Sequence, residues 1–155
     1  MTLYVAPIVE GQTEQGCVDR LLHRVWGDLL KRPERLQVIE AFRGHRDQLI
    51  HLNGAVLTET VRKAFLQMKA KSRRDTDASL LVLILLDAEQ DCPATLAPRL
   101  VKTAVESLAP GAVISCVLAK QMLENWIVGG ACSLASINGL PNAIPLRTDC
   151  LLYTS

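Results

Sequence analysis

The chain has 155 residues, enough for one domain with a substantial core but short for two. Its 17 basic and 16 acidic residues give a formal net charge of +1. This balance excludes a general polycation, so any contact with nucleic acid must come from a local basic patch. Because 49% of the residues are hydrophobic and only 4% are aromatic, helices packed on a sheet are favoured over a β-sandwich.

The cysteines and the hydropathy pattern predict a protein of the cytoplasm. The five cysteines are Cys17, Cys92, Cys116, Cys132 and Cys150. They form no C-x-x-C motif and fall inside apolar segments, so we expect reduced core residues in a reducing compartment. No signal-like leader and no apolar run of membrane-spanning length is expected either.

The first predicted element is a strand, Leu3 to Val9, which ends in the acidic turn E-G-Q-T-E. Pro7 cannot donate to a ladder, so this strand is expected near an edge or bulged at that point. Gly11 allows a tight turn into a helix. Thr13 is the expected N-cap, and Glu14 suits the first turn through the helix dipole.

The following helix is predicted to stop before Pro33. Its apolar residues recur at helical spacing and predict a buried stripe of Val18, Leu21, Leu22, Val25, Trp26, Leu29 and Leu30. A short strand, Leu36 to Phe42, comes next and leads into Arg43, Gly44, His45 and Arg46. The two arginines are candidates for binding phosphate, and a solvated loop is an equally good interpretation. An amphipathic helix is predicted for Thr58 to Met68, followed by a basic polar loop.

The strongest chemical pattern is S-L-L-V-L-I-L-L-D-A-E-Q-D-C-P, from Ser79 to Pro93. Its apolar run cannot alternate in and out, so both faces of the strand are expected to be covered, as in a central parallel strand. Asp87, Glu89 and Asp91 follow at the carboxyl end, where open α/β sheets bind ligands. Crowded carboxylates there suggest Mg²⁺ or Mn²⁺. The alternative is a solvated loop in which Asp91 leads into the next helix.

A third helix, Ala94 to Leu108, and a strand, Ala112 to Ala119, complete an alternating pattern that predicts a mostly parallel α/β sheet with right-handed crossovers. Glu124 and Trp126 follow, in a segment expected to open a short helix. The end, Cys150 to Ser155, reverse-translates to a sequence that resembles a sequencing adaptor. We therefore expect one domain over residues 1–149, truncated at its C-terminus, and a non-native tail after it.

Together, V-E-G-Q-T-E, the D-x-E-x-D cluster and E-N-W resemble the TOPRIM family. More narrowly, they are similar to an uncharacterised bacterial branch, often encoded beside ATPases and related in pattern to the overcoming-lysogenization-defect nucleases. The resemblance spans roughly Leu3 to Gly130. It rests on Glu10, Gly11, Thr13 and Glu14, then on Leu86 to Pro93, then on Ala119, Glu124 and Trp126.

The resemblance implies a TOPRIM-like three-layer sandwich with helices on both faces, and a catalytic glutamate at Glu10. It implies metal ligands at Asp87 and Glu89, with Asp91 and Glu14 as further candidates. Glu89 stands where the family carries a second aspartate. Related chains often carry one more acid where this one has Met122, and that departure puts a complete second metal site in doubt.

Two functions from different classes follow. The first is a Mg²⁺- or Mn²⁺-dependent nuclease or related phosphodiester enzyme, in DNA processing or phage defence, with Arg43 or Arg46 on the substrate phosphate. The second is a catalytically silent TOPRIM-like module that binds nucleic acid or a partner ATPase. A homodimer is compatible with either. A small-molecule phosphohydrolase on a similar sheet has no sequence mark of its own.

Overall fold

The computed structural model describes residues 1–51, 53–106 and 112–120, and strands alternate with helices along them. The strands are β1 (Thr2–Val9), β2 (Arg35–Val38), β3 (Phe42–Arg43), β4 (Ala78–Asp87) and β5 (Ala112–Ala119). The helices are α1 (Gln12–Arg24), its π-helical continuation η1 (Val25–Leu29), α2 (Arg46–Leu49), α3 (Ala55–Lys71) and α4 (Pro93–Glu106). The predicted order of elements is confirmed, with one predicted strand divided into β2 and β3.

All pairs of the described sheet are parallel, in the order β2-β1-β4-β5. β2 pairs with the first half of β1, and β3 pairs with the end of β1 on the same side. β1 and β4 run side by side from Thr2↔Ala78 to Val9↔Leu85, so their carboxyl ends lie together. The predicted α/β class with a parallel sheet is confirmed.

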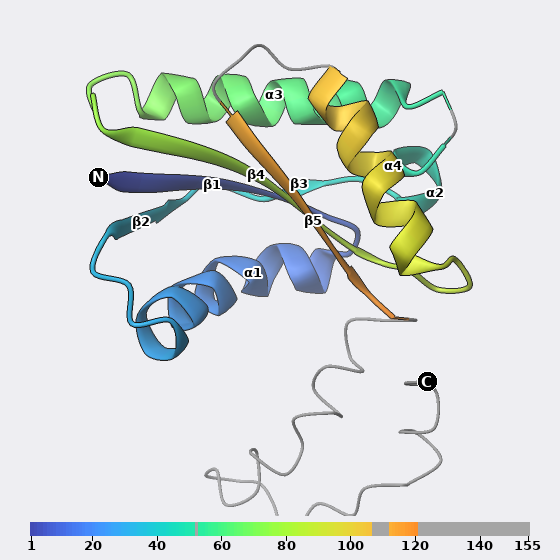
Figure 1. Cartoon of the computed structure of the whole chain (residues 1–155), viewed down its shortest axis with the longest axis horizontal. Helices are drawn as coiled ribbons and strands as arrows, with labels where there is room; N and C mark the ends of the chain where they lie inside the picture. Colours follow the sequence, from blue (N-terminus) through green and yellow to red (C-terminus); the bar gives the residue numbers. More distant parts are fainter. Residues whose placement is uncertain (52, 107–111, 121–155) are drawn as a thin grey trace, which may run out of the picture.

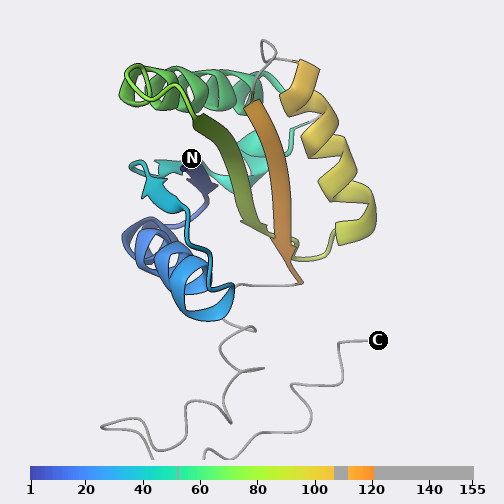
Figure 2. The ribbon, with the colours of Figure 1, turned by 60° about the vertical axis from the view of Figure 1, so that its left-hand side comes forward.

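Helices lie on both faces of this sheet. Figure 1 shows α3 and α4 on one face and α1 on the other, and Figure 2 gives the same layers from a second direction. The larger core lies under α3 and α4, where Ile8 and Ile84 of the sheet meet Leu57 of α3. Under α1 a smaller cluster joins Val18 to Val9 and Leu85. The carboxyl ends of β1 and β4 are thus held by packing on both faces.

Pro7 sits in a strand with neighbours on both sides, not at an edge. β1 pairs with β4 along its whole length, but its other neighbour is interrupted between β2 and β3, opposite this proline. Ile39 N–H donates to the Val5 carbonyl (2.9 Å) before the gap, and Gly44 N–H donates to the Val9 carbonyl (3.0 Å) after it. The donor that proline lacks therefore falls where no strand is present to receive it.

The expectation that the apolar run of β4 is covered on both faces is confirmed near its carboxyl end, where Leu85 is buried on the α1 side, but only in part further back. Val82 and Ile84, which face α3 and α4, are fully buried. Leu83 points to the other face and is half-buried, and Val113 of β5, which pairs with Leu81 on that face, is 66% exposed. The described helix on that face, α1, packs against β1, β2 and β3, which leaves β4 and β5 partly open there.

The predicted apolar stripe of the first helix is only partly buried. Val18 is the buried residue of α1, and Leu22 packs partly against the same cluster. Leu21, Leu29 and Leu30 are exposed, Leu29 to 74%. The spacing gave a helix correctly, but only its first half packs on the sheet.

Two features bear on the compartment, the cysteines and the helix lengths. Cys17, Cys92 and Cys116 are free thiols, but Cys17 and Cys92 are exposed, so the prediction of core positions is wrong for them. Cys116 is half-buried, and burial raises the pKa of its thiol to about 11. Cys132 and Cys150 lie outside the described residues. Within the described ranges, no helix has both the length and the apolar character needed to cross a membrane.

Candidate functional site

Two acidic segments meet at the carboxyl edge of the sheet. Glu10 is the first residue after β1, and Asp87 is the last residue of β4. Val9 is in register with Leu85 on the adjacent strand, so Glu10 and Asp87 lie close to each other at the carboxyl ends of the two strands. The sequence pattern predicts this meeting, and in open α/β sheets such an edge is where ligands bind.

Glu14 reaches this edge from the first turn of α1, because Gly11 leaves room for it. A Cβ atom at position 11 would collide with the Glu14 carboxylate, so the approach of this side chain requires glycine. Gly11 is also the N-cap of α1, and no side chain caps the helix. The prediction of Thr13 as N-cap is therefore wrong. Thr13 lies exposed within the first turn.

The electrostatic surroundings of Glu10 disfavour its ionised form. Burial is the largest cause that raises its pKa, and the nearby charges of Asp87 and Glu89 raise it further. Arg46 acts in the opposite direction. One carboxylate oxygen of Glu10 and one of Glu14 are buried and have no hydrogen-bond partner. Such oxygens are costly unless a donor or a cation satisfies them.

The acidic loop, residues 88–91, makes a tight turn between β4 and α4. Ala88 N–H donates to the Ala119 carbonyl at the end of β5 (2.8 Å), and Asp91 N–H donates back to the Ala88 carbonyl (2.8 Å). Between them Glu89 has a φ of 48°, a left-handed conformation that costs a non-glycine residue about 1–2 kcal/mol. α4 begins directly afterwards at Pro93, so the predicted helix entry is confirmed.

Arg46 is the basic residue that meets this loop. Its side chain is 7% exposed, whereas those of Glu89 and Asp91 are 56% and 47% exposed. Its Nε donates to the Asp87 carbonyl (2.8 Å) and its Nη2 to the Ala88 carbonyl (2.9 Å). The same guanidinium contacts the Asp91 carboxylate and lies 3.5 Å from Glu89 Oε2.

These contacts differ from the phosphate contact predicted for Arg46 from the sequence. The side chain is buried against the protein's own loop, which the sequence could not reveal because 41 residues separate Arg46 from Asp87. Arg43, the other predicted phosphate ligand, is exposed at the end of β3. Glu124 and Trp126 lie outside the described residues.

The donor types fit Mg²⁺ or Mn²⁺, but the present arrangement of side chains does not form a finished site. Hard carboxylate oxygens are the preferred ligands of both ions, and one buried oxygen each of Glu10 and Glu14 has no hydrogen-bond partner. Among residues 1–51, 53–106 and 112–120, however, no group of three His, Cys, Asp or Glu side chains is placed to hold one ion. Glu89 and Asp91 face Arg46 instead.

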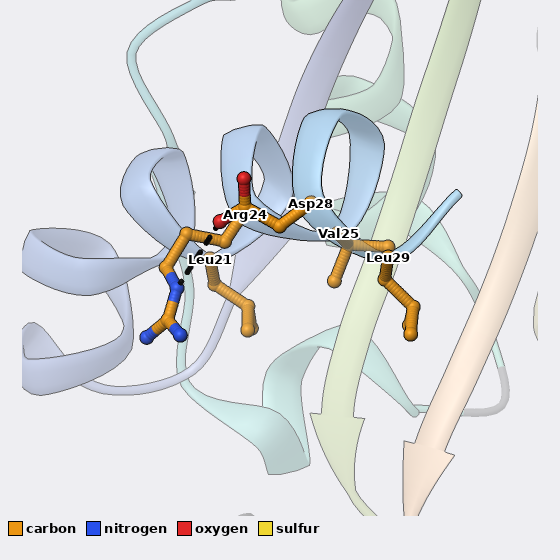
Figure 3. Close-up of a pocket in the computed structure, with 5 residues that line it drawn as sticks. All are labelled: Leu21, Arg24, Val25, Asp28 and Leu29. Carbon is orange, nitrogen blue, oxygen red and sulfur yellow. Dashed lines mark ion pairs between the residues drawn. The ribbon is translucent and has the colours of Figure 1, made fainter. Parts of the chain in front are cut away.

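A separate hollow lies along α1 and η1. In Figure 3 the side chains of Leu21, Val25 and Leu29 point to the same side, next to the ion pair of Arg24 and Asp28 (3.8 Å). This lining is apolar apart from the one pair, and its single carboxylate, Asp28, already faces Arg24. The acidic edge remains the candidate site.

No family model, no curated protein and no solved structure matches this chain.

Proposed function

We propose that this protein is a metal-dependent phosphodiesterase with a TOPRIM-like site, a nuclease that acts in DNA processing or phage defence in the cytoplasm. The observation that carries the proposal is the pair of buried, unpartnered carboxylate oxygens on Glu10 and Glu14. They lie at the sheet edge where Asp87 also ends, and the charge of Asp87 raises the pKa of Glu10. A divalent cation with oxygen preference supplies what this edge lacks.

In the proposed reaction Asp87 and Glu89 hold the cation, with Glu14 or Asp91 as further ligands, and Glu10 is the catalytic residue. When bound, Mg²⁺ or Mn²⁺ offsets charge on the phosphate oxygens and makes a water molecule more acidic. The raised pKa of Glu10 suits it to accept the proton of the attacking water. In this proposal Arg43, which is exposed at the end of β3 opposite Val9, contacts the substrate phosphate.

A second candidate is a catalytically silent module that binds nucleic acid or a partner ATPase. It is favoured by the absence, in the part of the chain that the structure describes, of three ligands gathered for one ion. It is also favoured by Arg46, which already serves as the positive partner of Glu89 and Asp91. A site with its own cation needs no metal to be stable.

Plasmid nicking in Mg²⁺ or Mn²⁺ distinguishes the two candidates. We expect cleavage by the wild-type chain and a loss of at least about 100-fold in Glu10→Gln and in Asp87→Asn, as for other acid–base residues. Matched controls make the same chemical changes on exposed helices, Glu59→Gln on α3 and Asp28→Asn, and are expected to cut normally.

Metal-dependent cutting that survives in both site variants would contradict the assignment of this edge. No cutting of DNA or RNA under any metal condition, with a neighbouring ATPase also present, would favour the silent module. Retention of nucleic-acid binding in that case, measured by gel shift, would support the second candidate directly. Sedimentation of the same samples would test the predicted homodimer.

A further inference from the structure

We propose that Arg46 is a positioning residue that fixes the acidic loop, residues 88–91, for cation binding, an inference that rests on the proposed function. It goes beyond a phosphate contact, because the guanidinium is turned into the protein. Its partners are the backbone carbonyls of Asp87 and Ala88 and the carboxylates of Glu89 and Asp91.

The two carbonyl contacts set the shape of the loop. The Nε and Nη2 atoms of one planar guanidinium donate to consecutive carbonyls at 2.8 and 2.9 Å. Those two residues are the ones that carry the chain from β4 into the loop. A rigid fork that binds two consecutive carbonyls fixes their relative orientation, and a lysine ammonium, which is a single point of charge, cannot reproduce it.

The same guanidinium limits the repulsion among the loop's carboxylates. Its Nη1 lies 3.5 Å from Glu89 Oε2, and its Nη2 contacts Asp91. Arg46 is the charge that lowers the pKa of Glu10 against the neighbouring acids that raise it. A single buried cation thus faces carboxylates from both strand ends, and without it they would repel one another, although solvent screens part of this repulsion because Glu89 and Asp91 are half-exposed.

Arg46 itself stands on a fixed base. Gly44 N–H donates to the Val9 carbonyl (3.0 Å), which ties the preceding residues to the end of β1. Leu49, three residues after Arg46, is fully buried and anchors α2 in the core. The acidic loop, with its half-exposed carboxylates, is less firmly held than this base. Arg46 therefore holds the loop, and not the reverse.

The test compares Arg46→Lys with wild type in two measurements. Amide hydrogen exchange of the metal-free protein reports the loop. We expect the Ala88 and Asp91 amides to exchange roughly tenfold faster in Arg46→Lys, the scale of one lost hydrogen bond to a charged group. Asp47→Asn is the control, because Asp47 also contacts Arg46 (3.4 Å) but lies outside the loop and is 93% exposed. Its loop exchange is expected to match wild type.

The second measurement is the dissociation constant for Mn²⁺ alone. Arg46→Lys keeps the positive charge, so competition with the metal is preserved and only the fork is lost. We expect roughly 10- to 100-fold weaker Mn²⁺ binding, as for groups that orient metal ligands. A residue that only stabilised the fold would leave this constant unchanged under conditions where both proteins are fully folded.

Unchanged loop exchange in Arg46→Lys would overturn the proposal. If the wild-type protein binds Mn²⁺, an unchanged Mn²⁺ affinity in Arg46→Lys would overturn it too. Failure of wild type to bind Mn²⁺ would instead reject the proposed function, while the exchange data would still decide whether Arg46 holds the loop. If Arg46→Lys does not fold, Asp91→Asn decides. It removes one half-exposed loop partner, and we expect faster exchange confined to the loop; exchange equal to wild type would overturn the proposal.

Discussion

Replacement of Arg46 by methionine gives the largest stability effect that we expect at the candidate site. The variant removes two charge-assisted hydrogen bonds to the Asp87 and Ala88 carbonyls, each worth about 1.5–3 kcal/mol. The contacts with Glu89 and Asp91 add at most about 1 kcal/mol each, because both carboxylates are half-exposed and screened. Burial of the methionine side chain recovers about 1–2 kcal/mol.

The middle values of these ranges give a net loss of about 4 kcal/mol. This agrees with the loss of about 3–5 kcal/mol found when a buried ion pair loses one partner. For a domain of this size it corresponds to a fall in melting temperature of roughly 6–20 °C. Urea unfolding of wild type and Arg46→Met measures the free energy directly. In 1 M NaCl the part of this free-energy loss that comes from the Glu89 and Asp91 carboxylates should shrink, because salt screens exposed ion pairs far more than buried contacts. The part that comes from the two carbonyl hydrogen bonds should stay the same.

Arg62→Met is the matched control. Arg62 lies on α3 and pairs with Glu59 on the surface, with 52% of its side chain exposed, so its replacement should change stability little. A loss below about 1 kcal/mol for Arg46→Met would refute the reasoning, because two buried hydrogen bonds from a charged donor cannot disappear at so small a cost.

Two further predictions concern the charge at the edge and the open face. Glu10→Gln should stabilise the metal-free protein at pH 7 but not at pH 4. Burial, Asp87 and Glu89 raise the pKa of Glu10 above 4.5, so the folded state binds the proton more tightly and wild-type stability falls as the pH rises through the raised value. Urea midpoints from pH 4 to 8 test it, and equal profiles would contradict it. Ile84→Ala should cost about 2–5 kcal/mol and Val113→Ala less than about 0.5, because the first is fully buried and the second is 66% exposed. Similar losses would show that the open face is covered.

The order of strands and helices was predictable because each element carries its own periodicity. The strand Ala112 to Ala119 has the predicted bounds, and the acidic residues fall at the ends of β1 and β4 as the pattern indicated. Parallel pairing follows from the alternation of strands and helices, and it alone is enough to bring Glu10 and Asp87 to one edge.

The depth of burial was less predictable, since periodicity shows which residues share a face but not how far a neighbour extends over it. Leu21 and Leu29 share the apolar side of α1 and η1, yet the sheet reaches only as far as Val18 and Leu22. Pro7 shows the opposite case. Its missing donor predicts a strand near an edge or bulged at that point. β1 lies next to the edge, and the edge strand is interrupted opposite Pro7.

The role of Arg46 lay beyond sequence reasoning for a physical reason. Its sequence position indicates a cation after a strand, which suits a bound phosphate as well as an internal carboxylate. Which of the two it meets depends on the path of a loop 41 residues away. In the structure that loop turns its carbonyls toward the guanidinium, which is then too buried to serve as an open phosphate site. An acidic edge that carries its own buried cation can stay folded without metal. Under our proposal, the strength of metal binding, and with it the choice between nuclease and silent module, would depend on how firmly Arg46 holds Glu89 and Asp91.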